Sequence, residues 1–243
     1  MTQIRLLETD YHPAAWNMAL DEAMLHIAAE NKNWTPSLRL YQWKPSAVSI
    51  GYFQSLEEEV DLNACKQHSV EVVRRITGGG AVFHDAELTY SFITKEYPAG
   101  IHDSYNLICG ATLDGLKTIG IEGQFVPIND LLVNSKKFSG NAQTRKRGVL
   151  LQHGTILLDV DVDKMFSLLK VPDEKLRGKM IATVKERVTA LHKPFDEVAG
   201  AIKQGFATRF NAQLEQSEIT QDELARCESL ITKYLSPEWN GRI

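Results

Sequence analysis

RRITGGGAVFHD, residues 74–85, places three consecutive glycines between a pair of arginines and a short apolar run. Glycine reaches positive φ without steric cost but weakens a strand, so a triple glycine indicates a segment of special backbone geometry. The segment fits neither the dinucleotide fingerprint G-x-G-x-x-G nor the phosphate loop G-x-x-x-x-G-K-S/T. Two readings stay open: a loop with unusual dihedrals, or a backbone platform whose bare N–H groups meet a phosphate while an arginine supplies charge.

The segments around the glycines predict strands. Short apolar and β-branched runs bounded by glycine, proline or polar residues are typical of them. Such runs lie at 38–43, 47–53, 70–76, 88–93 and 149–159, and residues 129–140 read as two strands joined at Asn134-Ser135.

Helical patterns dominate the beginning and the end of the chain. Residues 14–31 follow Pro13 and repeat Trp16, Leu20, Ala23 and Ile27 at helical spacing, which predicts an amphipathic helix. Further helices are expected at 104–120, after Pro194, and after Thr220, which forms a capping box with Glu223. Because strands cluster before helices and no linker divides the chain, we expect one α+β domain over 1–243, with 205–243 as its helical C-terminal tail.

Composition is that of an ordinary globular chain. It has 243 residues, 43% hydrophobic, and a net charge of -4, so it lacks the basic field that would favour nucleic acid or a membrane surface. Its three cysteines, Cys65, Cys109 and Cys227, are widely spaced and predict reduced thiols rather than a metal site. With no window near the roughly 18 apolar residues of a membrane span, we expect a cytoplasmic protein.

The glycine stretch, KKFSGNAQ (136–143) and LLQHGTILL (150–158) together resemble the lipoate–protein ligase family. Residues 17–23, 38–54 and 238–240 look similar to it as well. The resemblance implies a mixed, largely antiparallel sheet flanked by helices, related to biotin ligase. It also implies ATP-dependent activation of lipoate or octanoate to acyl-AMP, with magnesium, and transfer to a lysine of an apo lipoyl domain such as a 2-oxoacid dehydrogenase E2 or a glycine cleavage H protein.

Lys137 is the predicted catalytic residue, since it takes the lysine position of the family's Lys-x-Ser-Gly motif. Bringing a carboxylate to a phosphate requires a cation between the two anions. One unit-charge contact at about 4 Å contributes about 1 kcal/mol in bulk water but roughly 4 kcal/mol at an effective dielectric of about 20. Lys136 is expected on the opposite strand face as a solvated charge.

The same match predicts the nucleotide contacts, and Asp130 among them as the magnesium ligand. An Asx turn is the competing reading of Asn129 and Asp130. The predicted nucleotide-binding residues are Arg75, Gly78, Gly79, Gly80, Ala81, Val82, Phe83, Asn129, Asp130 and Lys137.

The acyl substrate calls for a mostly apolar tunnel with a polar end. A missing side chain at Gly154 would leave room for the acyl tail, whereas His153 is equally a hydrogen-bonded core histidine. His84 and Asp85 would support the conformation of the glycine loop. Arg74 is alternatively an ion-pair partner. Residues 141–148 are either a mobile segment that covers the nucleotide or an exposed loop. The predicted substrate-binding residues are Arg74, His84, Ser91, Gly140, Leu151, His153 and Gly154.

The competing function is an ATP-independent octanoyltransferase that takes its acyl group from acyl carrier protein through a cysteine thioester. Residues 87–91 and 140–154 resemble that branch too. Because a covalent transferase needs an activated thiolate and the matching region 124–133 contains no cysteine, the ligase is favoured. The intact triple glycine favours it as well. A non-catalytic lipoyl-domain binder is a third class.

The chain resembles short, archaeal-type ligases that lack the family's C-terminal accessory domain. Either a separate small subunit supplies that function, or the tail helices suffice.

Overall fold

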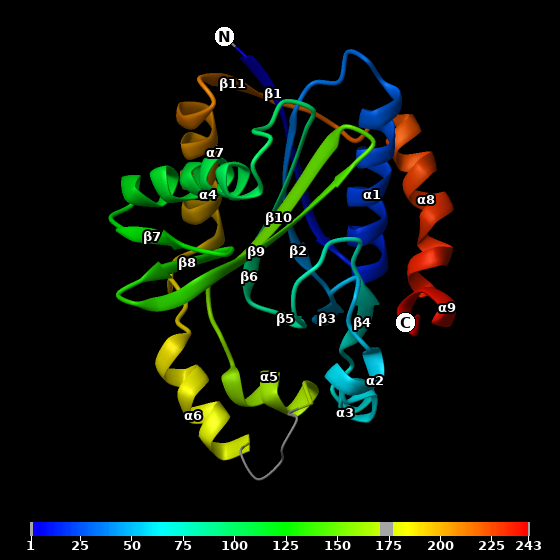
Figure 1. Cartoon of the computed structure of the whole chain (residues 1–243), viewed down its shortest axis with the longest axis vertical. Coiled ribbons are helices and arrows are strands. Elements are labelled where there is room, and N and C mark those ends of the chain that lie inside the picture. Colours follow the sequence, from blue (N-terminus) through cyan, green and yellow to red (C-terminus); the bar gives the residue numbers. More distant parts are fainter. Residues whose placement is uncertain (1, 171–176, 243) are drawn as a thin grey trace.

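A computed structural model describes residues 2–170 and 177–242 and contains a large and a small β-sheet (Figure 1). The large sheet has eight strands in the order β11-β1-β2-β6-β10-β9-β8-β7, and the small one has three in the order β4-β3-β5. The strands are β1 (Thr2–His12), β2 (Ser37–Trp43), β3 (Ala47–Ile50), β4 (Glu71–Arg74), β5 (Val82–His84), β6 (Glu87–Thr94), β7 (Gly123–Val126), β8 (Asp130–Val133), β9 (Lys136–Lys146), β10 (Val149–Leu157) and β11 (Ala212–Gln216).

Both sheets mix strand directions. In the large sheet β1 pairs in parallel with β2 and with β11, while the five remaining pairs from β2 to β7 are antiparallel. In the small sheet β3 is parallel to β4 and antiparallel to β5. The predicted α+β class and the mixed, largely antiparallel sheet are therefore confirmed.

Helices cover both faces of the large sheet (Figure 1). One face packs on α4 and α7 and the other on α1, whose outer side is covered by α8. The helices are α1 (Ala14–Glu30), α2 (Leu56–Glu59), α3 (Leu62–Gln67), α4 (Ile101–Thr118), α5 (Val162–Leu168), α6 (Arg177–Arg187), α7 (Phe195–Arg209), α8 (Gln221–Leu235) and α9 (Pro237–Asn240). Among these described helices, none is both long and apolar enough to cross a membrane.

Local signals in the sequence located several elements correctly. Pro13 and Pro194 are the N-cap residues of α1 and α7, and Thr220 forms the predicted capping box with Glu223 at the start of α8. Asn134 and Ser135 have φ of 49° and 63°, as a tight turn between β8 and β9 requires. These signals act within a few residues, so tertiary context does not override them.

The amphipathic character predicted for α1 is wrong. Trp16 and Ile27 are only partly buried, whereas Asn17, Asp21 and Glu22 are buried. The reason is that α8 covers the outer side of α1, so polar side chains are enclosed on both sides.

Most of the segment 141–148 is a strand and not a loop, whereas Lys146, Arg147 and Gly148 at the turn into β10 are exposed, as the loop alternative predicts. Residues 141–146 belong to β9 and pair with β10. Arg145 donates to the carbonyl oxygens of Ala99 and Gly100 and to the hydroxyl of Ser104, so it is not a solvated charge. The predicted helical tail likewise contains a strand, β11, at the edge of the large sheet.

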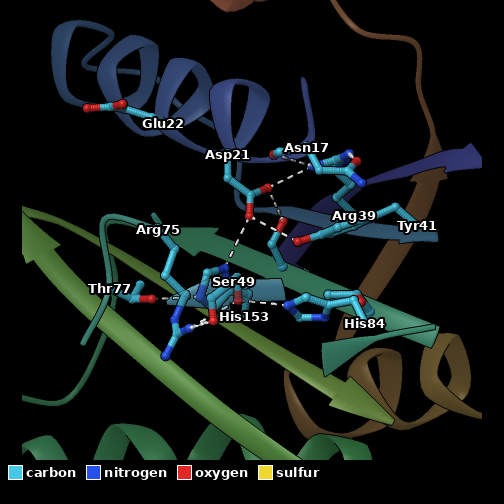
Figure 2. A network of polar contacts seen from close by, with 12 residues as sticks. Asn17, Asp21, Glu22, Arg39, Tyr41, Ser49, Arg75, Thr77, His84 and His153 are labelled. Atoms are coloured by element: carbon cyan, nitrogen blue, oxygen red, sulfur yellow. Dashed lines mark hydrogen bonds and ion pairs between the residues drawn. The ribbon is translucent and has the colours of Figure 1, made fainter. Parts of the chain in front are cut away.

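A buried polar network joins α1 to the large sheet (Figure 2). The Asp21 carboxylate accepts from Arg39 at 2.9 Å and from Ser91 at 2.8 Å, and it lies 3.4 Å from Nδ1 of His153. Burial acts to raise the pKa of Asp21, but the hydrogen bond from His153 and the charge of Arg39 outweigh it and lower that pKa. Burial also lowers the pKa of His153, against the opposing influence of Asp21.

The triple glycine packs against another glycine, Gly51. A side chain at position 51 would collide with the carbonyl group of Gly79, whereas one at Gly78 would meet no atom within 4 Å. Gly79 has φ of 95°, which other residues rarely adopt. The close backbone approach is therefore between two segments of this chain, at Gly51 and Gly79.

We predict that Gly51→Ala destabilises the protein and Gly78→Ala does not. The first change overpacks a backbone contact, which costs roughly 1–3 kcal/mol. At about 2–4 °C per kcal/mol, Tm falls by several degrees. Gly78→Ala is the matched control, with an effect within about 0.5 kcal/mol. Thermal unfolding of both variants checks this, and equal Tm values would contradict it.

We also predict that His153 makes stability depend on pH. Because its folded pKa lies below 6.5, the unfolded chain binds a proton that the folded protein does not as pH falls below about 6.5. The free energy of unfolding is therefore level above that pH and falls below it, down to the folded pKa. Urea unfolding between about pH 8 and about pH 5.5 measures the slope, which should be smaller in His153→Gln. An unchanged slope in that variant would assign the dependence to other groups.

Candidate functional site

One cavity of about 150 Å³ lies where the small sheet meets the centre of the large one. Strands β2, β3, β5, β6, β9 and β10 contribute to its wall, together with α1 and the glycine stretch. Its lining residues are Met18, Tyr41, Trp43, Ser49, Arg75, Gly80, Ala81, Val82, His84, Thr89, Asn129, Lys137, Gly140, Asn141, Ala142, His153, Gly154 and Thr155.

The cavity brings together predicted residues from four separate parts of the sequence. They come from the arginine and glycine stretch, from the segment that precedes β8, from strand β9 and from strand β10. These residues are Arg75, Gly80, Ala81, Val82, His84, Asn129, Lys137, Gly140, His153 and Gly154.

Other predicted residues lie outside the cavity wall. Ser91 belongs to the Asp21 network, and Leu151 packs in the core against α1. Phe83 packs in the small core beneath β3, while Gly78, Gly79 and Asp130 border the site without lining it.

Arg74 is buried but turns away from the cavity. Its guanidinium donates to the carbonyl oxygens of Gly51, Tyr52 and Gln54 and to those of Trp239 and Asn240. It therefore connects α9 to the loop after β3 and does not face a substrate in the cavity. None of these contacts is an ion pair, so the alternative reading of Arg74 as an ion-pair partner does not describe it.

The space expected over Gly154 is filled. A side chain at this position would collide with the Asn141 amide and the Tyr90 ring. Those two side chains are themselves joined, because Tyr90 donates a 2.6 Å hydrogen bond to Asn141. Gly154 thus makes room for Asn141, which does line the cavity, rather than for a substrate tail.

Arg75 holds the glycine stretch against β3. Its guanidinium donates to the carbonyl oxygens of Gly78 at 2.9 Å and Gly80 at 2.6 Å, and to Ser49 through both the carbonyl oxygen and Oγ. Burial lowers the pKa of Arg75 to about 10, which leaves the group cationic at neutral pH. A permanent cation therefore lies in the wall of the cavity.

Lys137 places a second cation at the cavity. Its ammonium lies 2.7 Å from Oδ1 of Asp130, and both side chains are partly exposed. That carboxylate oxygen has no hydrogen bond of good geometry among the described residues, so the contact is an ion pair approached from an unfavourable angle. Lys136 is exposed, as the alternation of strand side chains predicts.

A second polar chain, missed by the sequence reasoning, starts at Ser49 in the cavity wall (Figure 2). Ser49 Oγ lies 2.7 Å from Nε2 of His84, and Nδ1 of His84 lies 2.7 Å from Oε1 of Glu87. The signal that could have found it is a serine inside the short apolar run Ala47–Ile50, since buried polar groups need partners.

Apolar residues of α1 and β2 complete the wall. Met18, Tyr41 and Trp43 line the cavity and were also missed. Trp43 stacks on the His84 ring with centroids 4.0 Å apart. A large apolar surface beside a few directed polar groups is typical of a site for a small organic ligand.

The three cysteines lie elsewhere. Cys65 is in α3, Cys109 in α4 and Cys227 in α8, and all are buried free thiols. Burial raises their pKa values to about 11, about 12 and about 11 respectively. They are the opposite of the exposed, low-pKa thiols that act as nucleophiles.

Comparison with known proteins gives consistent relatives. The family described as lipoyl protein ligase A/B catalytic domain matches residues 13–207. Proteins named octanoyltransferase LipM are similar over the whole length: that of Geobacillus kaustophilus is 38% identical with 97% of each chain covered, and that of Brevibacillus brevis is 36% identical with 100% of each covered. A bi-partite lipoate protein ligase from Thermoplasma acidophilum has a TM-score of 0.92 at 32% identity, over 100% of this chain and 97% of that one.

These relatives correct the predicted activity. The curated proteins that match nearly end to end are named octanoyltransferases, so the prediction of an ATP-dependent ligase is wrong, and so is that of ATP and magnesium as cofactors. The site has a matching feature, because the carboxylate of Asp130, the predicted magnesium ligand, already faces the Lys137 ammonium.

The fold, the cavity and the full-length similarity all support the family resemblance that the glycine stretch and the Lys-x-Ser-Gly motif indicate. The chain belongs to the lipoyl protein ligase A/B catalytic domain family.

Proposed function

We propose that this protein is an octanoyltransferase that moves a medium-length acyl group from the thioester of an acyl carrier protein to a lysine of an apo lipoyl domain, without ATP. The observation that carries the proposal is full-length similarity, at 36–38% identity, to proteins named octanoyltransferase. The expected lipoyl-domain partners stay part of the proposal, whereas the adenylation step that called for an accessory subunit does not.

The cavity suits an acyl thioester. Met18, Tyr41 and Trp43 give an apolar wall for a hydrocarbon chain, while Lys137 and Asn129 give a polar border for the carbonyl end. Attack on a thioester places negative charge on the carbonyl oxygen, and a nearby cation stabilises that charge. We assign this role to the Lys137 ammonium, whose position is set by Asp130.

We predict that the acyl donor is a carrier thioester. Purified protein, octanoyl-acyl carrier protein and an apo lipoyl domain should give the octanoylated domain without ATP, as a mass increase on the lipoyl domain. The parallel reaction contains free octanoate, ATP and magnesium in place of the carrier. Product in that second reaction alone would contradict the proposed function.

We predict that Lys137→Ala lowers the rate of this transfer by about 10²-fold, the usual cost of losing one group that stabilises an oxyanion. Lys136→Ala is the matched control, because its exposed side chain lies on the other face of β9, and its rate should stay within about twofold. The rate of lipoyl-domain octanoylation measures both variants. If the two lose activity equally, general charge rather than the position of Lys137 matters.

A further inference from the structure

The cavity contains no cysteine among the residues that the structure describes, although acyl transfer through a covalent intermediate needs a nucleophile there. Cys65, Cys109 and Cys227 lie in helices outside it, with pKa values raised by burial. Ser49 on β3 does line the cavity, and its hydroxyl is hydrogen-bonded to a histidine.

Ser49, His84 and Glu87 form a continuous hydrogen-bonded chain. The two distances, Oγ to Nε2 and Nδ1 to Oε1, are both 2.7 Å. In the tautomer that satisfies both contacts, Nδ1–H donates to the carboxylate and Nε2 accepts the serine proton. A hydroxyl, an imidazole and a carboxylate in this order have the connectivity of a nucleophile, a base and the group that orients the base.

Neighbouring side chains hold Ser49, His84 and Glu87 in one geometry. Trp43 stacks on the His84 ring with an interplanar angle of 15° and donates through its indole N–H to Thr89, which donates to Oε1 of Glu87. The other carboxylate oxygen, Oε2, is buried without a hydrogen-bond partner in the described ranges. Thr89 and His84 therefore hold the Glu87 carboxylate in place, and its negative charge can balance the positive charge of an imidazolium that forms on His84.

Arg75 places a positive charge beside the Ser49 hydroxyl. Its guanidinium donates to Ser49 Oγ at 3.0 Å, so developing negative charge on this oxygen lies beside a buried cation. The same guanidinium fixes the carbonyl oxygens of Gly78 and Gly80. Gly80, Ala81 and Val82 line the same cavity as Ser49.

From this geometry we propose that Ser49 is the acyl-accepting nucleophile of the site, that His84 is its general base, and that Glu87 positions the histidine. The inference rests on the proposed function for the source of the acyl group. The covalent intermediate in this proposal is an acyl ester of Ser49.

The atoms balance over two half-reactions. Ser49 Oγ attacks the thioester carbon while its proton passes to Nε2 of His84; the carbon–sulfur bond breaks, and the carrier thiolate takes that proton. A neutral lysine amine of the lipoyl domain then attacks the ester carbon and gives a proton to Nε2. The carbon–oxygen bond breaks, Ser49 Oγ regains the proton, and an amide remains.

The first test looks for the ester. The protein is incubated with octanoyl-acyl carrier protein without acceptor, digested, and its peptides are analysed by mass spectrometry. One octanoyl group is expected on the peptide that contains Ser49. Ser49→Ala should lose both this group and at least about 10³-fold of the transfer rate. Transfer at the native rate in this variant would overturn the inference.

The control is Ser46→Ala, three residues earlier. Its hydroxyl donates to Asp85 and does not line the cavity, so acylation and transfer should continue. Ser49→Cys is a second control, because a thiol at this position should still accept the acyl group, now as a thioester that neutral hydroxylamine cleaves. A purely structural role of the Ser49 hydroxyl predicts no acyl group on that cysteine.

A second probe separates this inference from the proposed function. p-Nitrophenyl octanoate carries its own leaving group and needs no carrier protein. A stoichiometric burst of p-nitrophenolate, with octanoyl on Ser49, is expected and would uphold the nucleophile even if octanoyl-acyl carrier protein proves not to be a donor. No burst and no acyl-Ser49 with this probe would overturn it, whatever the carrier assay shows.

Glu87 is tested through pH. Glu87→Gln removes the charge that orients and stabilises His84, and should lower the burst rate by about 10²- to 10⁴-fold and change its pH profile. A burst rate and pH profile equal to those of the native protein would show that Glu87 does not position His84.

Discussion

The guanidinium of Arg75 is the constraint on which the site depends. It is buried, still cationic, and shared between the carbonyl and hydroxyl oxygens of Ser49 and the carbonyl oxygens of Gly78 and Gly80. A buried cation without these acceptors would carry a large desolvation cost, so the glycine stretch and β3 are held together by it. The shape of the cavity wall follows from that contact.

Of the two interpretations of the triple glycine, the positive φ of Gly79 supports a loop with unusual dihedrals. Gly79 has the positive φ, but the position without room for a side chain is Gly51, which precedes Gly79 by 28 residues in the sequence and packs against it in space. Sequence patterns locate unusual backbone, yet they do not show which segment approaches it. The same limit explains Gly154, where the missing side chain accommodates Asn141.

What could be predicted from the sequence was set by local interactions. The turn at Asn134-Ser135, the capping box at Thr220 and the class of the fold follow from contacts within a few residues or from the order of elements. The buried polar side of α1 and the role of Ser49 depend instead on what covers them: α8 on one side, and β4 and β5 on the other. No periodicity within α1 or β3 contains that information.

The motifs also could not decide the acyl donor. Lys137, Gly80 and His153 gather at one cavity, as the resemblance implied, but a site for an acyl chain and its carbonyl group needs the same kinds of group whatever activates the acyl carbon. The absence of a cysteine in residues 124–133 argued for the wrong branch because it assumed that a covalent transferase must use a thiol. A hydroxyl activated by an imidazole meets the same chemical need.

The two neighbouring arginines show how one strand end serves both fold and site. Consecutive side chains at the end of β4 leave in opposite directions, so Arg75 reaches the cavity while Arg74 reaches α9. Arg74 donates to carbonyl oxygens of Trp239 and Asn240, and the Trp239 indole donates back to the carbonyl oxygen of Arg74. The terminal Glu-Trp-Asn segment, far from the cavity in sequence, thereby braces the strand from which Arg75 holds the glycine stretch. The C-terminal helix α9 therefore contributes to the rigidity of the site through backbone carbonyl groups.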